Sequence, residues 1–95
     1  MVEYLSPREC DDLEEARARG RDWARVIRCF LDGARLLLGW DRALPEDEIA
    51  RLAGIDRAGL HAAIDEAVRW CVARRLHLLG LQEPDDSWRY FMAVG

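Results

Sequence analysis

The chain has 95 residues and a formal net charge of −4 at pH 7. A chain of this length supports one hydrophobic core, and a composition of 51% hydrophobic and 34% charged residues argues against disorder. The sequence has no run of about 20 apolar residues and no basic and apolar leader, so we expect a cytoplasmic protein with no membrane partner.

The first predicted helix begins at Ser6, which is placed as an N-cap with Pro7 at the first helical position. Glu9 stands three residues after Ser6, where it can complete a capping box. Gly20 predicts a break or kink, so residues 1–20 form an N-terminal helical extension.

Arginines recur every three or four residues around Gly20, at Arg17, Arg21, Arg25 and Arg28. A ridge of this kind could contact phosphate groups or an acidic protein surface. Carboxylates lie one turn earlier, however, where Glu14 can pair with Arg17 and Asp22 with Arg25. We therefore expect ion pairs within the chain.

Apolar residues at three- and four-residue intervals predict the main core helix, from about Arg21 to Leu38. They are Trp23, Val26, Ile27, Phe30, Leu31, Ala34, Leu37 and Leu38. Cys29, Leu36 and Trp40 lie off this stripe, so the helix has more apolar surface than one core requires. We infer that a second packing partner covers the excess.

The stretch ARLAGIDRAGLHAAI, residues 50–64, has the spacing of a helix-turn-helix. Pro45 and the acidic residues after it begin a short helix, Gly54 makes the turn, and Asp56 is the N-cap of a helix from Arg57 to about Arg74. The buried stripe of this last helix is Leu60, Ile64, Ala67 and Cys71.

Two short apolar runs, LHLLGLQ and WRYFMAV, follow on either side of the turn-forming segment EPDDS and predict a β-hairpin. In the second run, one face carries Trp88, Tyr90, Met92 and Val94, and the other carries Arg89, Phe91 and Ala93. Both faces of the hairpin are therefore largely apolar.

The small or apolar packing positions Ala50, Gly54, Ile55, Leu60 and Ala63, with the hairpin that follows, resemble the winged helix-turn-helix superfamily from about residue 21 to the end. The resemblance implies one α+β, mostly helical domain over residues 1–95. Residues 1–20 are then an extra helical extension, 21–75 the helical core and 76–95 the hairpin wing. In that superfamily the second helix of the motif commonly enters the major groove.

The resemblance implies a small DNA-binding transcriptional regulator that binds double-stranded DNA. Its candidate contacts are Arg57, His61, Arg69, Arg74, Arg75 and Arg89. An acidic domain has no general attraction for phosphates, and Asp56 and Asp65 accompany Arg57 at the start of the predicted recognition helix. The arginines are equally consistent with solvated or ion-paired side chains.

The alternative is a winged-helix adaptor or inhibitor that binds protein and does not read DNA. Its candidate interface residues are Leu36, Trp40, Trp88, Tyr90 and Phe91. Aromatic residues are enriched at interface centres, so we expect a homodimer that uses the N-terminal helices, the wing or both. Against this, Tyr90 and Phe91 could simply complete the core of this domain.

Catalytic, metal and cofactor sites are not expected. Cys10, Cys29 and Cys71 are widely spaced with no CxxC pair, which favours buried thiols over disulfides or a zinc site. The two histidines lack metal-site spacing, and the sequence has neither a nucleophile elbow nor a glycine-rich phosphate loop. We therefore expect a protein that is not an enzyme.

Overall fold

The computed structural model describes residues 5–33 and 35–95; Ala34 of the predicted apolar stripe and residues 1–4 of the predicted extension lie outside them. The order of elements is α1 (Pro7–Ala18), α2 (Asp22–Arg28), β1 (Leu31–Asp32), β2 (Arg35–Leu36), the 3₁₀ helix η1 (Trp40–Arg42), β3 (Leu44–Pro45), α3 (Glu46–Ala53), α4 (Arg57–Val72), β4 (Leu76–Gln82) and β5 (Trp88–Val94). The predicted α+β class is confirmed. Across the described ranges, none of the helices is long and apolar enough to cross a membrane.

The predicted start of α1 is confirmed in detail. The backbone N–H of Glu9 donates to Ser6 Oγ at 3.2 Å, and the Ser6 N–H donates to Glu9 Oε1 at 3.0 Å. The helix ends just before Gly20, whose φ of +79° suits glycine. The other end of α1 is tied to α4, because Arg74 Nε lies 3.0 Å from Glu9 Oε2 and the Arg74 guanidinium lies 3.9 Å from the centre of the Trp70 ring.

The predicted helix from Arg21 to Leu38 is wrong beyond Arg28. The chain leaves α2 there and forms a small antiparallel hairpin, in which Leu31 pairs with Leu36 and Asp32 pairs with Arg35. Gly33, with φ +66°, lies in its turn. Phe30 and Leu36 reach the core, and Leu31 and Leu38 pack against it, from strand and loop positions, so their helical spacing did not indicate a helix.

The two helices and the intervening turn predicted from Pro45 to about Arg74 are present as α3, Gly54 and α4. Gly54 ends α3 in the left-handed conformation, with φ +67°, and Asp56 caps α4 by accepting a hydrogen bond from the Gly59 N–H at 2.9 Å. The predicted stripe of α4, Leu60, Ile64, Ala67 and Cys71, is buried. The short helix starts one residue later than predicted, because Pro45 ends β3.

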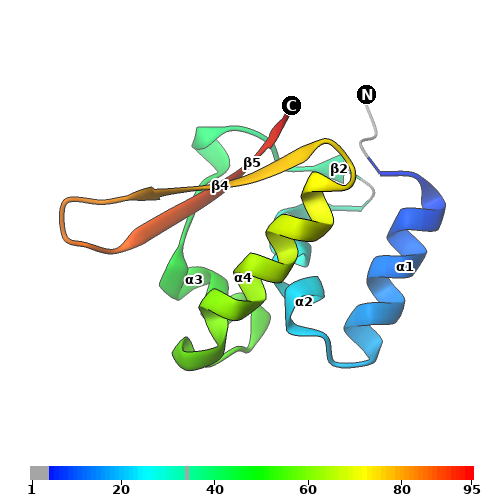
Figure 1. Ribbon diagram of the computed structural model, residues 1–95, viewed down its shortest axis with the longest axis horizontal. Coiled ribbons are helices and arrows are strands. Elements are labelled where there is room, and N and C mark those ends of the chain that lie inside the picture. The colour runs from blue at the N-terminus through cyan, green and yellow to red at the C-terminus, as the bar shows by residue number, and fades with distance from the viewer. Residues whose placement is uncertain (1–4, 34) are drawn as a thin grey trace.

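The C-terminal hairpin is confirmed as two seven-residue strands, with Leu79 opposite Phe91. In the three-stranded sheet the order is β3-β5-β4, so β4 is an edge strand in the described part of the chain. Figure 1 shows α3 and α4 on one side of this sheet, and η1 lies against β5, where Trp40 contacts Phe91. The core lies between this sheet and the helices, where Phe30, Ile49 and Met92 have no exposed surface.

Candidate functional site

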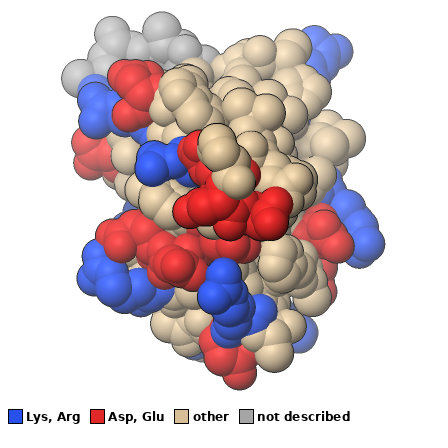
Figure 2. Space-filling view, turned by 90° about the vertical axis from the view of Figure 1, so that its left-hand side faces the viewer, with Lys and Arg blue, Asp and Glu red and all other residues tan. Residues whose placement is uncertain are grey.

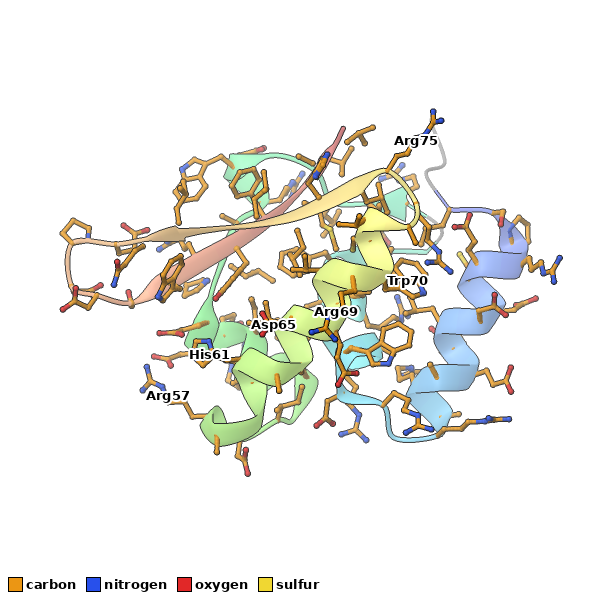
Figure 3. The ribbon with its side chains drawn as sticks, in the orientation of Figure 1. Arg57, His61, Asp65, Arg69, Trp70 and Arg75 are labelled. Carbon is orange, nitrogen blue, oxygen red and sulfur yellow. The ribbon has the colours of Figure 1, made fainter. Side chains whose placement is uncertain are left out.

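The exposed face of α4 presents a row of four side chains spaced four residues apart: Arg57, His61, Asp65 and Arg69, here called the α4 row. Figure 3 shows them following one another along the helix. All four are exposed, as the DNA-binding hypothesis requires. Asp65 interrupts the row with a negative charge between His61 and Arg69.

Carboxylates from α3 pair with the first half of the α4 row. Arg57 Nη2 lies 3.3 Å from Glu46 Oε1 and 3.6 Å from Asp47 Oδ1, and His61 Nε2 lies 3.7 Å from Glu46 Oε2. Glu46 is only 4% exposed, so its charge depends on these neighbours for compensation. Arg57 is thus both a possible donor to a ligand and the counter-charge of a buried carboxylate.

The remaining predicted DNA contacts do not gather with the α4 row. Arg74 is engaged by Glu9 and Trp70 next to α1, and Arg89 Nε lies 2.9 Å from Glu83 Oε1 on the hairpin. Arg75 is exposed at the opposite end of α4 from Arg57 (Figure 3). The six predicted contacts therefore do not form one continuous basic surface.

The hairpin turn adds negative charge on the side where α4 begins. It carries Glu83, Asp85 and Asp86, and Figure 2, which views the molecule from the hairpin tip, shows acidic side chains across the middle of that face. Hydrogen bonds from the Ser87 hydroxyl and N–H hold the pKa of Asp85 below its ordinary value, so this carboxylate stays charged. A phosphate backbone approaching from this side would meet like charge.

Of the five predicted interface residues, some are buried in the core and others lie at the surface. Leu36 is 5% exposed and Tyr90 is 9% exposed, so both belong mainly to the core of this domain. Trp88 stacks beside Tyr90 on the inner face of the hairpin, with ring centres 6.3 Å apart. Trp40 and Phe91 do meet at the surface, with ring centres 5.4 Å apart in an edge-to-face arrangement.

Two leucines on β4 extend the surface that Trp40 and Phe91 begin. Leu79 is 42% exposed, Leu81 is 52% exposed and Trp40 is 48% exposed. Leu79 lies opposite Phe91 in the register, Leu81 follows two residues later on the same face, and Trp40 packs on Phe91. These four side chains share the side of the sheet opposite α3 and α4, here called the outer sheet face. Sequence reasoning omitted the two leucines, although the alternation in LHLLGLQ separates them from the buried Leu76 and Leu78.

Cavities accompany these surfaces, and one of about 320 Å³ at the hairpin turn is lined in part by Glu83, Ser87 and Arg89. A cavity of about 410 Å³ lies between α1 and the first hairpin, lined in part by Leu13, Leu31 and Arg28. Arg28 Nε lies 3.0 Å from Glu14 Oε1 there, which leaves this cation paired. Among the residues that the structure describes, no group of three or more His, Cys, Asp or Glu side chains could hold a metal ion.

The three comparisons with known proteins add no relatives. Neither protein-family models, nor curated proteins, nor solved structures gave a match to this chain. Any function must therefore be argued from the α4 row, the hairpin turn and the outer sheet face.

Proposed function

We propose that this chain is a winged helix-turn-helix domain that acts by binding protein. The order α2, α3, a left-handed glycine turn, α4 and a hairpin supports the winged-helix part of the proposal. The fold alone does not select a ligand, because function depends on the surfaces that a fold carries.

The outer sheet face is the observation that carries the protein-binding part. Trp40, Leu79 and Leu81 each expose about half of their surface in one area, next to Phe91. Contiguous apolar surface of this kind marks interaction sites on soluble domains, and aromatic residues are enriched at their centres. DNA has no comparable apolar surface to offer this face.

The electrostatics of the α4 row also favour protein over DNA. Binding to a phosphate backbone depends on arginines and lysines that release counterions. Here Glu46 and Asp47 already neutralise Arg57, and the hairpin turn adds Glu83, Asp85 and Asp86 on the same side. Bound phosphate would have to displace or overcome these carboxylates.

DNA binding is the second candidate function, supported by Arg69 and Arg75. Within residues 5–33 and 35–95, neither guanidinium lies within 4.0 Å of a carboxylate, so both are available to contact phosphates. The two arginines lie toward the C-terminal end of α4, away from the acidic hairpin turn (Figure 3). A regulator of this kind would read DNA with a different part of α4 from the one predicted.

A titration against mixed double-stranded DNA at two salt concentrations distinguishes the two functions. If the chain binds protein, its affinity for DNA should be negligible at both salt concentrations. The variants Arg69→Ala and Arg75→Ala should then bind DNA no differently from the wild type. Salt-sensitive binding that these two variants weaken would refute our proposal, because phosphate-driven affinity falls as salt rises.

Contact at the outer sheet face is tested by a photo-crosslinking side chain at position 79, in cells, with position 52 as the control. Leu52 on α3 is 51% exposed and lies outside the outer sheet face. Crosslinks to protein from position 79, with none from position 52, are the expected result. Equal yields at both positions would count against the proposal.

A further inference from the structure

Three arginines of the ridge identified in the sequence line one small cavity between α1, α2 and α3. Arg17 comes from the last turn of α1, and Arg25 and Arg28 come from the last turn of α2. Leu52 and Ala53, at the end of α3, form the rest of the lining. The cavity lies outside the α4 row, the hairpin turn and the outer sheet face, so the proposed function does not use it.

The ion pairs of these arginines leave guanidinium donors for a ligand. Arg17 donates two hydrogen bonds to Glu14 Oε2, at 2.7 and 3.0 Å. The buried Nε of Arg28 lies 3.0 Å from Glu14 Oε1, yet within residues 5–33 and 35–95 it has no hydrogen-bond partner. Arg25 Nη1 is 3.8 Å from Asp22 Oδ1, which is beyond hydrogen-bond distance. Since each guanidinium carries five N–H donors, Arg25 and Arg28 keep donors for an incoming acceptor.

The charges at the cavity leave one positive charge in excess. The three arginines are paired with two carboxylates, those of Glu14 and Asp22. The neighbouring ion pairs add no net charge, and they are Glu15–Arg19 on α1 and Glu48–Arg51 on α3. A local excess of positive charge, in a chain whose formal net charge is −4, favours an anionic ligand at this place.

The size and chemistry of the cavity indicate a single phosphate group. Its volume of about 190 Å³ is below the roughly 300–1,000 Å³ of pockets for drug-sized ligands, so it suits a small anion or one terminal group. Guanidinium donors match the oxygens of phosphate in geometry and charge. A phosphate monoester carries a charge of about −1.5 to −2 at pH 7, so it attracts three arginines more strongly than a carboxylate does.

We propose that this cavity binds a phosphate group, either as free phosphate or as the terminal group of a phosphomonoester. Arg25 and Arg28 supply the hydrogen-bond donors. Arg17 stays hydrogen-bonded to Glu14 and contributes its charge. Leu52 offers apolar surface to the carbon atoms of an ester. The inference goes beyond the proposed protein-binding function and is independent of it, because the cavity and the outer sheet face share no residue.

An NMR titration of the isotope-labelled protein with inorganic phosphate, at neutral pH and constant ionic strength, tests the proposal. The Nε–H signals of Arg25 and Arg28 should shift and reach saturation, and acetate at the same concentrations should shift them far less. Arg25→Gln should weaken phosphate binding by about tenfold, as loss of a charge-assisted hydrogen bond does. Arg19→Gln removes the same charge just after α1 but outside the cavity, and it should leave the affinity nearly unchanged.

Glu14→Gln provides a second test that keeps all three arginines. It removes the carboxylate that competes with phosphate for Arg17 and Arg28, so phosphate binding should become several-fold tighter. Circular dichroism and thermal unfolding confirm that every variant is folded. Glycerol 3-phosphate in place of inorganic phosphate distinguishes the two sources: tighter binding of the ester identifies a phosphomonoester, and equal or weaker binding identifies phosphate itself.

Signals that shift without saturation, or that shift equally with acetate, would overturn the phosphate site. An affinity that Arg25→Gln and Glu14→Gln both leave unchanged would overturn it as well, because phosphate would then bind elsewhere. Either result leaves the protein-binding function intact, since that function is tested by crosslinking at position 79.

Discussion

Gly54, in the turn between α3 and α4, and Gly59, in the first turn of α4, should respond in opposite directions to substitution by alanine. Gly54 has φ +67°, and an added Cβ would have no neighbour within 4 Å, so Gly54→Ala incurs a backbone cost without a steric clash. An L-residue in the left-handed conformation costs roughly 1–2 kcal/mol, partly offset because alanine lowers the entropy of the unfolded chain. We expect a net loss of about 1 kcal/mol, or about 4–8 °C in Tm for a domain of this size.

Gly59, five residues further on, lies in the first turn of α4 with ordinary helical geometry. An added Cβ would meet Asp56 Oδ1 at 3.4 Å and Ile55 Cγ2 at 3.6 Å, which are normal contacts. Gly59→Ala should therefore stabilise the protein, by up to about 0.5–1 kcal/mol. The capping hydrogen bond from the Gly59 N–H to Asp56 is retained, since the backbone N–H is unchanged.

Urea denaturation of the wild type, Gly54→Ala, Gly59→Ala and Gly54→Asn measures these changes. Asparagine tolerates the left-handed conformation better than alanine, so Gly54→Asn should lose less stability than Gly54→Ala. A neutral or stabilising Gly54→Ala would show that the turn does not have the geometry described, and our account of the helix-turn-helix would fail.

Two further predictions concern charge and thiol burial. Arg57→Ala should lower the free energy of unfolding by about 1 kcal/mol, because it leaves the buried Glu46 carboxylate without its closest cation. The control variant Arg69→Ala should change the free energy of unfolding by less than about 0.5 kcal/mol. Equal losses for the two variants in urea denaturation would contradict this prediction. Burial raises the pKa of Cys29 and of Cys71 from the ordinary value of 9.0 to about 11. Since the folded thiols keep their protons where the unfolded ones ionise, the free energy of unfolding should fall between pH 9 and 11, and a rise over that range would refute it.

Local sequence signals predicted the helix caps, the turn at Gly54 and the C-terminal hairpin. The capping box at Ser6, the N-cap at Asp56 and the turn at Gly54 are each fixed by one or two residues, and all three are present. The hairpin followed from the change to a two-residue period. The expected ion pairs Glu14–Arg17 and Asp22–Arg25 also form, at 2.7 and 3.8 Å.

The error in residues 29–38 has a physical reason. A short run of apolar residues satisfies a helical period and a pair of strands about equally well, so periodicity alone does not separate them. Asp32-Gly33 between apolar residues is a hairpin signal, and Gly39, with φ +99°, marks a further break. These glycines outweighed the apolar spacing.

The candidate surfaces were harder to predict because they depend on contacts between distant segments. Exposure of the α4 row followed from helical spacing, but its neutralisation by Glu46 requires α3 to pack beside it. Trp40 meets Phe91 across 50 intervening residues, a contact set by the way η1 lies against β5. The spacing of apolar residues predicts which face of a helix or strand a side chain lies on. It does not predict which distant segment of the chain packs against that face.

The edge position of β4 has a consequence for the behaviour of the protein in solution. A strand with one unpaired edge can accept further strands, and β4 carries none of the charged or proline residues that usually prevent this. Mutual repulsion between chains of net charge −4 opposes such addition at neutral pH. That repulsion disappears near the isoelectric point of about 5.1, so mildly acidic buffers should favour edge-to-edge addition through β4.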